Sequence, residues 1–222
     1  MNRIARSCRS GCAISLAALL GAPLLSGCKV MTIQEDAALR ARRAANFDAA
    51  HYVDEIWAKK AVPTIERRAV PADKLVRAID TGLDRAGDDY GRRVGEGSAW
   101  TFVISGTGVV TAIDTTSRRG SADVALSGGA AGRVVRLQIG PIVSGTAIRD
   151  ALPFVSFNDF ADQLAFADVG RALTKRSLDN LRPVLARLRP GASIRFTGVA
   201  NVRAPGEPLT VTPVAISAGG VS

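Results

Sequence analysis

Five polar side chains between residues 149 and 163 have the types and spacing of a ligand site. They follow a stretch that is interrupted by Gly140 and Gly145, and they are Arg149, Asp150, Asn158, Asp159 and Gln163. Binding sites for small molecules set a few convergent polar groups in an otherwise apolar pocket. A guanidinium beside carboxylates and amides suits a sugar or a carboxylate, so we expect a small polar pocket formed by this segment.

The same segment has a second, structural interpretation. Neighbouring opposite charges often satisfy each other or nearby loop backbone, which Arg149 and Asp150 could do. A third interpretation, a hydrolase that uses Asp150 and Asp159, is weaker because loop carboxylates are common, although carboxylate pairs do catalyse hydrolysis. In the structural interpretation, three aromatic residues of the segment belong to the core, and they are Phe154, Phe157 and Phe160.

Other catalytic constellations are missing from the sequence. The chain has a single histidine, His51, and its three cysteines, Cys8, Cys12 and Cys28, all lie in the N-terminal stretch that we expect to be removed or lipidated, so no usual zinc site or Cys-His pair is expected. No GxSxG motif supplies a nucleophilic serine. The stretch GTGVVT at 106–111 precedes a strand pattern rather than a helix, so it does not fit a phosphate-binding loop. We therefore expect neither an enzyme nor a metal or cofactor.

The N-terminus indicates a secretion signal that ends in a lipidated cysteine. Three arginines precede an apolar run from Ala13 to Leu25, which is too short to span a bilayer. Small residues and Cys28 follow, and this stretch resembles the lipobox of bacterial lipoproteins, whose cysteine is alkylated with diacylglycerol. The resemblance implies a signal peptide over 1–27, lipidated Cys28 and a tether over 28–45. The residues of the cleavage site would be Leu25, Ser26 and Gly27.

The charge balance fits a location at the cell envelope. The chain has 29 basic and 20 acidic residues, and a signal peptide with three arginines and no acid would leave a mature net charge of +6. Basic chains often bind nucleic acid, but a secreted protein without a polybasic run is not expected to. Lys29 follows the cysteine where an aspartate would resemble an inner-membrane retention signal. We therefore expect a periplasmic protein anchored to the outer membrane.

Apolar periodicity predicts helices first and strands later in the chain. A cap at Asn46 begins the first helix and Pro63 should stop it, while Pro71 and Gly87 bound the second. Gly106 and Gly108 suggest a bend that lets one strand serve two edges of a small barrel. The predicted elements are helices over 46–61, 71–87 and 158–188, the last capped by Ser156 or Asn158 and kinked or divided at Pro183, and strands over 100–113, 123–126, 133–140, 142–148, 193–202 and 209–216.

The element order predicts an α+β fold. N-terminal helices over 46–97 precede an OB-like five-stranded Greek-key barrel over 98–217, with the helices of 158–188 inserted between its third and fourth strands. A generic α+β sandwich is the alternative.

Four segments resemble a known family. They are FDAAHYVDEIWAKKAVPTI at 47–65, YGRRVGEG at 90–97, LQIGPIVSGTAIRDALPFVSFNDFADQ at 137–163 and VTPVAI at 211–216. The family they resemble comprises bacterial predicted periplasmic lipoproteins, a domain of unknown function often encoded beside ribose-type sugar ABC transporters. The family pattern often has Thr-Asn where this chain has Ala161 and Asp162. The resemblance implies a lipid-anchored envelope protein with an OB-like barrel, and it supplies no catalytic residues.

Two functions follow from these observations. The first is a non-enzymatic accessory or small-solute-binding lipoprotein, whose partners are the membrane, sugar ABC transporter components or a sugar. The alternative is a structural or assembly lipoprotein that binds an envelope polymer or a protein through the barrel face. An apolar groove with Arg149 pointing in would favour the first, and a flat face with Trp57 and Trp100 on its rim would favour the second.

Overall fold

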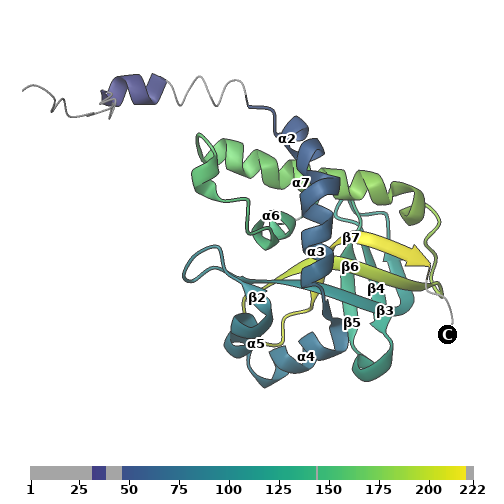
Figure 1. Cartoon of the computed structure of the whole chain (residues 1–222). Helices are drawn as coiled ribbons and strands as arrows, with labels where there is room; N and C mark the ends of the chain where they lie inside the picture. Colours follow the sequence, from purple (N-terminus) through teal and green to yellow (C-terminus); the bar gives the residue numbers. More distant parts are fainter. Residues whose placement is uncertain (1–31, 39–46, 144, 219–222) are drawn as a thin grey trace, which may run out of the picture.

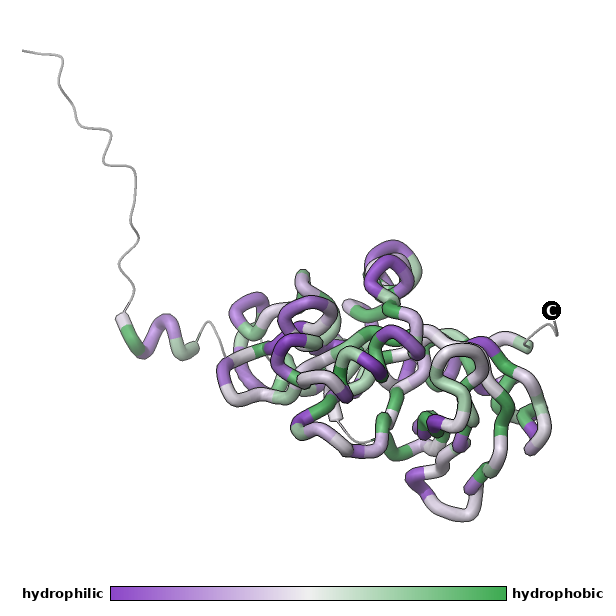
Figure 2. The backbone as a smooth tube through the Cα atoms, turned by 90° about the horizontal axis from the view of Figure 1, so that it is seen from below, coloured by the Kyte–Doolittle hydropathy of each residue, from purple (hydrophilic) through white to green (hydrophobic). Residues whose placement is uncertain are grey.

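The computed structural model describes residues 32–38, 47–143 and 145–218 (Figure 1). The predicted cleavage and lipidation site, Leu25 to Cys28, lies outside the described residues, and so does Asn46. Residues 33–38 form a short helix, and the remaining elements build one α+β body. Hydrophobic and hydrophilic residues alternate along this body, as expected of elements with one buried face (Figure 2).

Five strands close into the predicted OB-like barrel. They are β3 (Trp100–Asp114), β4 (Ser121–Leu126), β5 (Val134–Gln138), β6 (Ser193–Val202) and β7 (Thr210–Ala218). The sheet runs β3-β4-β5-β7-β6, and β6 pairs again with β3 to close it. The β5–β7 pair is parallel and the other pairs of the barrel are antiparallel. Two short strands also pair with the first part of β3: β1 (Val70–Pro71) is parallel to it and β2 (Gly91–Arg92) is antiparallel.

Strand β3 serves two edges of the barrel, as its glycines predicted. Its first part pairs with β6 and its second part with β4, and the two pairings overlap at Gly108 and Val109. A Cβ at Gly108 would lie 2.3 Å from the carbonyl oxygen of Ala125, so only glycine permits this approach of two backbones. The register with β4 shifts between Val110 and Ala112, where the strand leaves one partner for the other.

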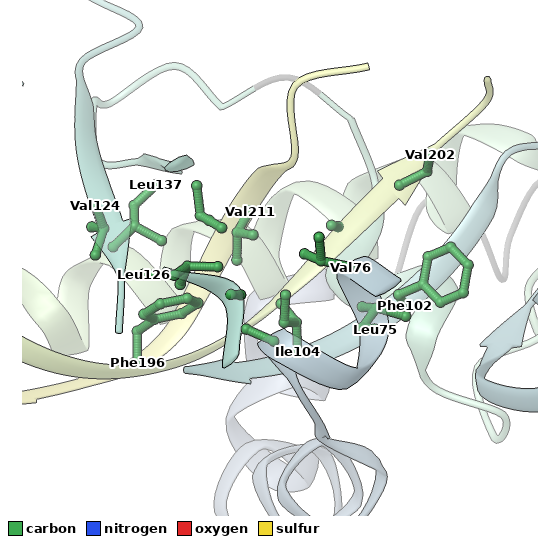
Figure 3. Close-up of a cluster of buried hydrophobic side chains, with 14 of the residues drawn as sticks. Leu75, Val76, Phe102, Ile104, Val124, Leu126, Leu137, Phe196, Val202 and Val211 are labelled. Atoms are coloured by element: carbon green, nitrogen blue, oxygen red, sulfur yellow. The ribbon is translucent and has the colours of Figure 1, made fainter. Parts of the chain in front are cut away.

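The faces of the barrel strands bury two separate cores. The inner face carries residues such as Phe102 and Ile104, while Val103, one position along β3, points to the other core. That second core lies under the helices and also receives Val199 and Val214. Figure 3 shows the first core, which includes Leu75, Val76, Phe102, Ile104, Val124, Leu126, Leu137, Phe196, Val202 and Val211.

The first helical segment continues past Pro63, so the predicted stop near Ala61 is wrong. Helix α2 (Ala49–Ile56) passes through a π-helical turn (Trp57–Ala61) into α3 (Val62–Arg68). Pro63 falls in the first turn of α3, where its missing N–H costs little. The cap of α2 is Asp48, whose Oδ1 accepts from the backbone N–H groups of Ala50 and His51 at 2.8 and 3.1 Å.

The second predicted helix is two helices. Helix α4 (Ala72–Thr81) and helix α5 (Leu83–Tyr90) meet at Gly82, whose φ of 173° is extended backbone. Helix α5 runs past the predicted end at Gly87 and continues to Tyr90. Gly87 packs against the ring of Trp100. A Cβ at Gly87 would lie 2.1 Å from Trp100 Cε2. Close packing, and not helix termination, explains this glycine.

Between β5 and β6 the predicted strand over 142–148 is wrong. The chain there is a loop followed by helix α6 (Ala147–Ala151), and the 3-10 turn Phe157–Asp159 comes next. Helix α7 (Gln163–Leu185) begins at Asp162, whose Oδ1 accepts from Ala165 N at 2.8 Å, so neither predicted cap begins it. Pro183 does not divide α7, which continues for two residues beyond it and ends at Leu185.

Candidate functional site

Arg149 and Asp150 form a buried ion pair at α6. Arg149 Nε and Nη2 donate to Asp150 Oδ1 at 2.9 and 2.7 Å, and each side chain is only 11% exposed. The guanidinium also stacks on the ring of Phe166, 3.8 Å from its centroid. Both charges are therefore committed to partners within the chain.

Further hydrogen bonds fix this pair in place. Thr146 Oγ1 donates to Asp150 Oδ2 at 2.5 Å, so both carboxylate oxygens accept. From the short strand β2, Arg92 Nη1 donates to the carbonyl oxygens of Asp150 and Leu152 at 2.7 and 3.1 Å. The network ties α6 to β2 and α7, and it fits the structural interpretation of this segment.

The other three predicted binding residues are exposed, and one of them caps a turn. Asp159 Oδ2 accepts from Ser156 N at 2.9 Å in a capping box, and Asn158 and Gln163 are exposed. None of the five predicted residues lines the groove that runs beside α7.

The phenylalanines of this segment join an aromatic cluster that includes the start of α2. Phe160 contacts Phe47 and Phe166 with ring centroids 5.5 and 5.6 Å apart, and Phe157 contacts Phe166 at 5.7 Å. Phe154 and Phe160 pack against the second core, whereas Phe157 is 48% exposed. The cluster holds the α6–α7 connection against α2.

A groove of about 1140 Å³ runs beside α7, and we call it the α7 groove. One wall is a face of α7 from Asp168 to Leu185, continued by Ala186 directly after the helix. The opposite wall is the loop over 139–143 after β5. The first turn of α2 completes the lining. Such a volume is slightly above the usual range for small-molecule sites in proteins.

The wall opposite α7 is apolar and held by the barrel. Its side chains include Ile139, Pro141, Ile142 and Val143. Backbone N–H groups of this loop donate to carbonyl oxygens of the preceding hairpin, such as Ile142 N to Arg118 O at 3.1 Å. These bonds fix the loop, and Ile142 remains 41% exposed to the groove.

The α7 wall combines apolar and charged residues. Leu178 and Leu185 line the groove half-buried, while Leu181 and Leu188 of the same predicted stripe are buried in the first core. Buried Ser177 anchors the middle of the helix by donating to the Pro213 carbonyl of β7 at 2.6 Å. Helix α7 thus presents one face to the barrel and a neighbouring face to the groove.

The charged residues of this wall pair along the helix. Lys175 Nζ and Arg182 Nη2 each lie 2.5 Å from a carboxylate oxygen of Asp179, and Arg171 pairs with Asp168. Hydrogen bonds and the positive charge of Lys175 and Arg182 lower the pKa of Asp179, so this group stays ionised. The cations are 66–78% exposed and the two carboxylates 35–40%. Asp48 of the α2 wall is a third carboxylate, so the formal charges that line the groove balance.

Sequence reasoning missed this groove. The charged and apolar groove residues of α7 recur at spacings of three and four, as in Asp168, Arg171, Lys175, Leu178 and Arg182. That spacing predicts a helix face, but the opposite wall comes from a segment that we predicted as a strand. The two walls could therefore not be paired from the sequence.

The other residues singled out in the sequence are His51, Trp57 and Trp100. His51 is 72% exposed, with Nε2 3.4 Å from Glu55 Oε1. No group of three His, Cys, Asp or Glu residues in the described ranges is placed to hold a metal ion. Trp57 and Trp100 are 5% and 9% exposed, so neither is available as a contact on a barrel rim.

Comparison with protein families places the chain. Residues 18–217 match the model of a family described as "Predicted periplasmic lipoprotein (DUF2291)". The chain belongs to this family. Membership in this lipoprotein family confirms the resemblance stated from residues 47–65, 90–97, 137–163 and 211–216. No curated protein matches the sequence.

Solved structures support the barrel assignment of this lipoprotein. A crystal structure of an OB-fold protein from Thermotoga maritima MSB8 matches with a TM-score of 0.63 and 18% identity, over 78% of this chain and 99% of that one. At this identity the likeness shows the fold alone. A second structure, the OBody AM1L10 bound to hen egg-white lysozyme, has 14% identity over 56% of this chain and 83% of that chain, and its TM-score of 0.29 is too low to indicate a shared fold.

Proposed function

We propose that this lipoprotein is a non-enzymatic accessory protein that binds its ligand or partner in the α7 groove. The groove carries the proposal, because it combines an apolar wall with a charged rim on a rigid support. Convergent polar groups at the edge of an apolar hollow are typical of binding sites. The buried Arg149–Asp150 pair is already satisfied, which supports a structural role for the residues first predicted to bind.

The proposed setting is the periplasmic face of the outer membrane. Lipid attached at Cys28 would hold the chain there, since stable anchoring takes more than one acyl chain and a diacylglycerol cysteine supplies them. In the described residues no helix is long and apolar enough to cross a bilayer. The choice of the outer membrane rests on Lys29 following the cysteine.

We further propose a link to a sugar ABC transport system, in which the protein contacts a transporter component or the sugar itself. The link rests on the family resemblance, and the groove offers a surface for it. A soluble sugar-binding component of such a system is the partner to test first.

Co-purification from native membranes tests this function. The full chain with a C-terminal tag should retain a transporter component, and Ile142→Asp, on the apolar wall, should lose it. Val134→Asp is the matched control, because Val134 is 51% exposed and lies outside the groove. A panel of sugars should raise the melting temperature if the sugar itself binds, by mass action. The proposed function would be refuted if no transporter component were retained and no sugar raised the melting temperature.

A further inference from the structure

The segment over 156–164, which leads into the first turn of α7, exposes two large apolar side chains, and we call it the α7 tip. Phe157 is 48% exposed, and Leu164 is 64% exposed, which is the largest fraction among the large apolar residues of 47–143 and 145–218. Figure 1 shows this end of α7 projecting beyond the barrel, on the opposite side from β4 and β5. Exposed apolar side chains among polar neighbours are typical of a surface that contacts a membrane or another protein.

The backbone of the α7 tip makes its hydrogen bonds within the chain. Asp159 N donates to Ser156 O at 3.0 Å, and Asp159 Oδ2 accepts from Ser156 N at 2.9 Å. Asp162 Oδ1 accepts from Ala165 N at 2.8 Å, which satisfies the start of α7. Because an unsatisfied N–H group is costly in contact with lipid, these bonds suit the tip to a membrane interface.

The N-terminal tether enters the body of the protein at the α7 tip. The described body begins at Phe47, whose ring lies edge-on to Phe160 of the tip with the ring centroids 5.5 Å apart. Phe160 contacts Phe166 at 5.6 Å, and Phe157 packs edge-on to the other partner of this contact, Phe166, at 5.7 Å. The chain that follows Cys28 therefore reaches the body beside the exposed apolar side chains.

The length of the tether keeps the α7 tip close to any membrane that holds Cys28. Residues 28–46 span no more than about 70 Å, even at full extension. A covalent link of this length makes contact between the tip and the bilayer an intramolecular event, at an effective concentration of roughly millimolar. Two partly exposed side chains can then hold a surface that they would bind too weakly on their own.

We infer that the α7 tip inserts Phe157 and Leu164 into the interface of the membrane to which Cys28 is anchored. The inference rests on the anchor of the proposed function and goes beyond it, because it fixes which end of the body faces the bilayer. The exposed carboxylates of Asp159 and Asp162 confine the insertion to the headgroup region, since a charge is costly deeper in the bilayer. Strands β4 and β5 then lie on the side away from the membrane (Figure 1).

Quenching of tryptophan fluorescence by brominated lipid tests the inference. Cys28 is the single cysteine of the mature chain, so it can be coupled to a maleimide-headgroup lipid in phosphatidylcholine vesicles. Leu164→Trp places a reporter on the α7 tip. Val134→Trp is the matched control, because Val134 is 51% exposed and lies on β5. The unsubstituted chain gives the background from Trp57 and Trp100, which are both buried.

The expected result is selective and shallow quenching. Dibromo-phosphatidylcholine should quench the added emission of Leu164→Trp at least about twice as strongly as that of Val134→Trp, because insertion at an interface reaches about 5–10 Å into the boundary of headgroups and acyl chains. Bromines at carbons 6 and 7 of the acyl chain should quench more than bromines at carbons 11 and 12. Adding Phe157→Ser to the Leu164→Trp chain should reduce the quenching, because half of the inserted apolar surface is lost.

Three outcomes would overturn the inference. The first is equal quenching of the reporters at 164 and 134, and the second is stronger quenching by the deeper bromines. The third is a dimer of the mature Cys28→Ser chain in sedimentation that Leu164→Gln dissociates, because the α7 tip would then bind a second copy. Leu164 is mostly exposed, so its substitution leaves the fold intact, which thermal unfolding checks.

The result is separable from that of the proposed function. Loss of transporter co-purification in Ile142→Asp together with equal quenching of the two reporters would leave the function standing and overturn the membrane contact. Selective quenching of Leu164→Trp without co-purification would do the reverse.

Discussion

Replacing Asp150 decides whether the Arg149–Asp150 pair is structural. In Asp150→Ala the Arg149 guanidinium stays buried against Phe166 without its carboxylate, and Thr146 loses its acceptor. Removing one partner of a buried ion pair costs about 3–5 kcal/mol, mainly because an uncompensated charge remains. In a chain of this size each kcal/mol lowers the melting temperature by about 2–4 °C, so we expect a decrease of about 6–20 °C.

The double variant Arg149→Met with Asp150→Ala is the matched control. It removes both charges, and the methionine sulfur can keep an apolar contact with the ring of Phe166. Replacing both members of a buried pair with apolar groups is often close to neutral, so the double variant should melt above Asp150→Ala.

Thermal unfolding followed by circular dichroism measures these differences at pH 7. If the melting temperature of Asp150→Ala fell by less than about 2 °C from that of the wild type, the structural role of the buried pair would be refuted. A double variant that melts at a lower temperature than Asp150→Ala would refute it as well. A stable Asp150→Ala protein that no longer binds a sugar recognised by the wild type would instead restore the first prediction, a ligand pocket at Arg149 and Asp150.

Three further predictions follow from the sequence and the packing. Gly87→Ala should lower the melting temperature by about 2–12 °C, because its Cβ would displace Trp100 at a cost of about 1–3 kcal/mol, whereas Gly82→Ala, with nothing within 4 Å, should not; equal melting of the two variants would contradict this. The hydrogen bond from Arg136 lowers the pKa of Asp123, so the stability it adds is present above about pH 4 and disappears as the pH falls through the lowered pKa. The wild type should therefore melt above Asp123→Asn at pH 7, with the difference shrinking as the pH falls below about 4; a difference that does not depend on pH would be inconsistent with linkage. Cys28→Ser should release the protein from the membrane fraction, and unchanged fractionation would exclude lipid attachment at Cys28.

Local signals in the sequence predicted the barrel well. Alternating apolar residues identified 193–202 as a strand, and β6 has these bounds. Gly106 and Gly108 predicted the bend in β3 because glycine in a strand marks close backbone approach, which depends only on neighbouring atoms.

Predictions failed where distant packing overrides local preference. Pro63 is a strong helix-stopping signal, yet the π-helical turn before it lets the helix continue against the second core. Gly87 is a common helix terminator, yet Trp100 from a later strand requires a glycine at that place. The segment 142–148 has strand-like composition but no sheet edge available, because the closed pairing of β5 with β7 leaves none for it.

The sequence by itself determined the order of the five barrel strands and the family, because periodicity and short motifs encode these properties directly. Only the tertiary structure decided which polar residues face a hollow. It buries Arg149 with Asp150 and leaves Arg171, Lys175 and Arg182 on the rim of the α7 groove. The physical reason is that a groove needs two walls, and its walls here meet only after the barrel has closed and α7 has packed on β7.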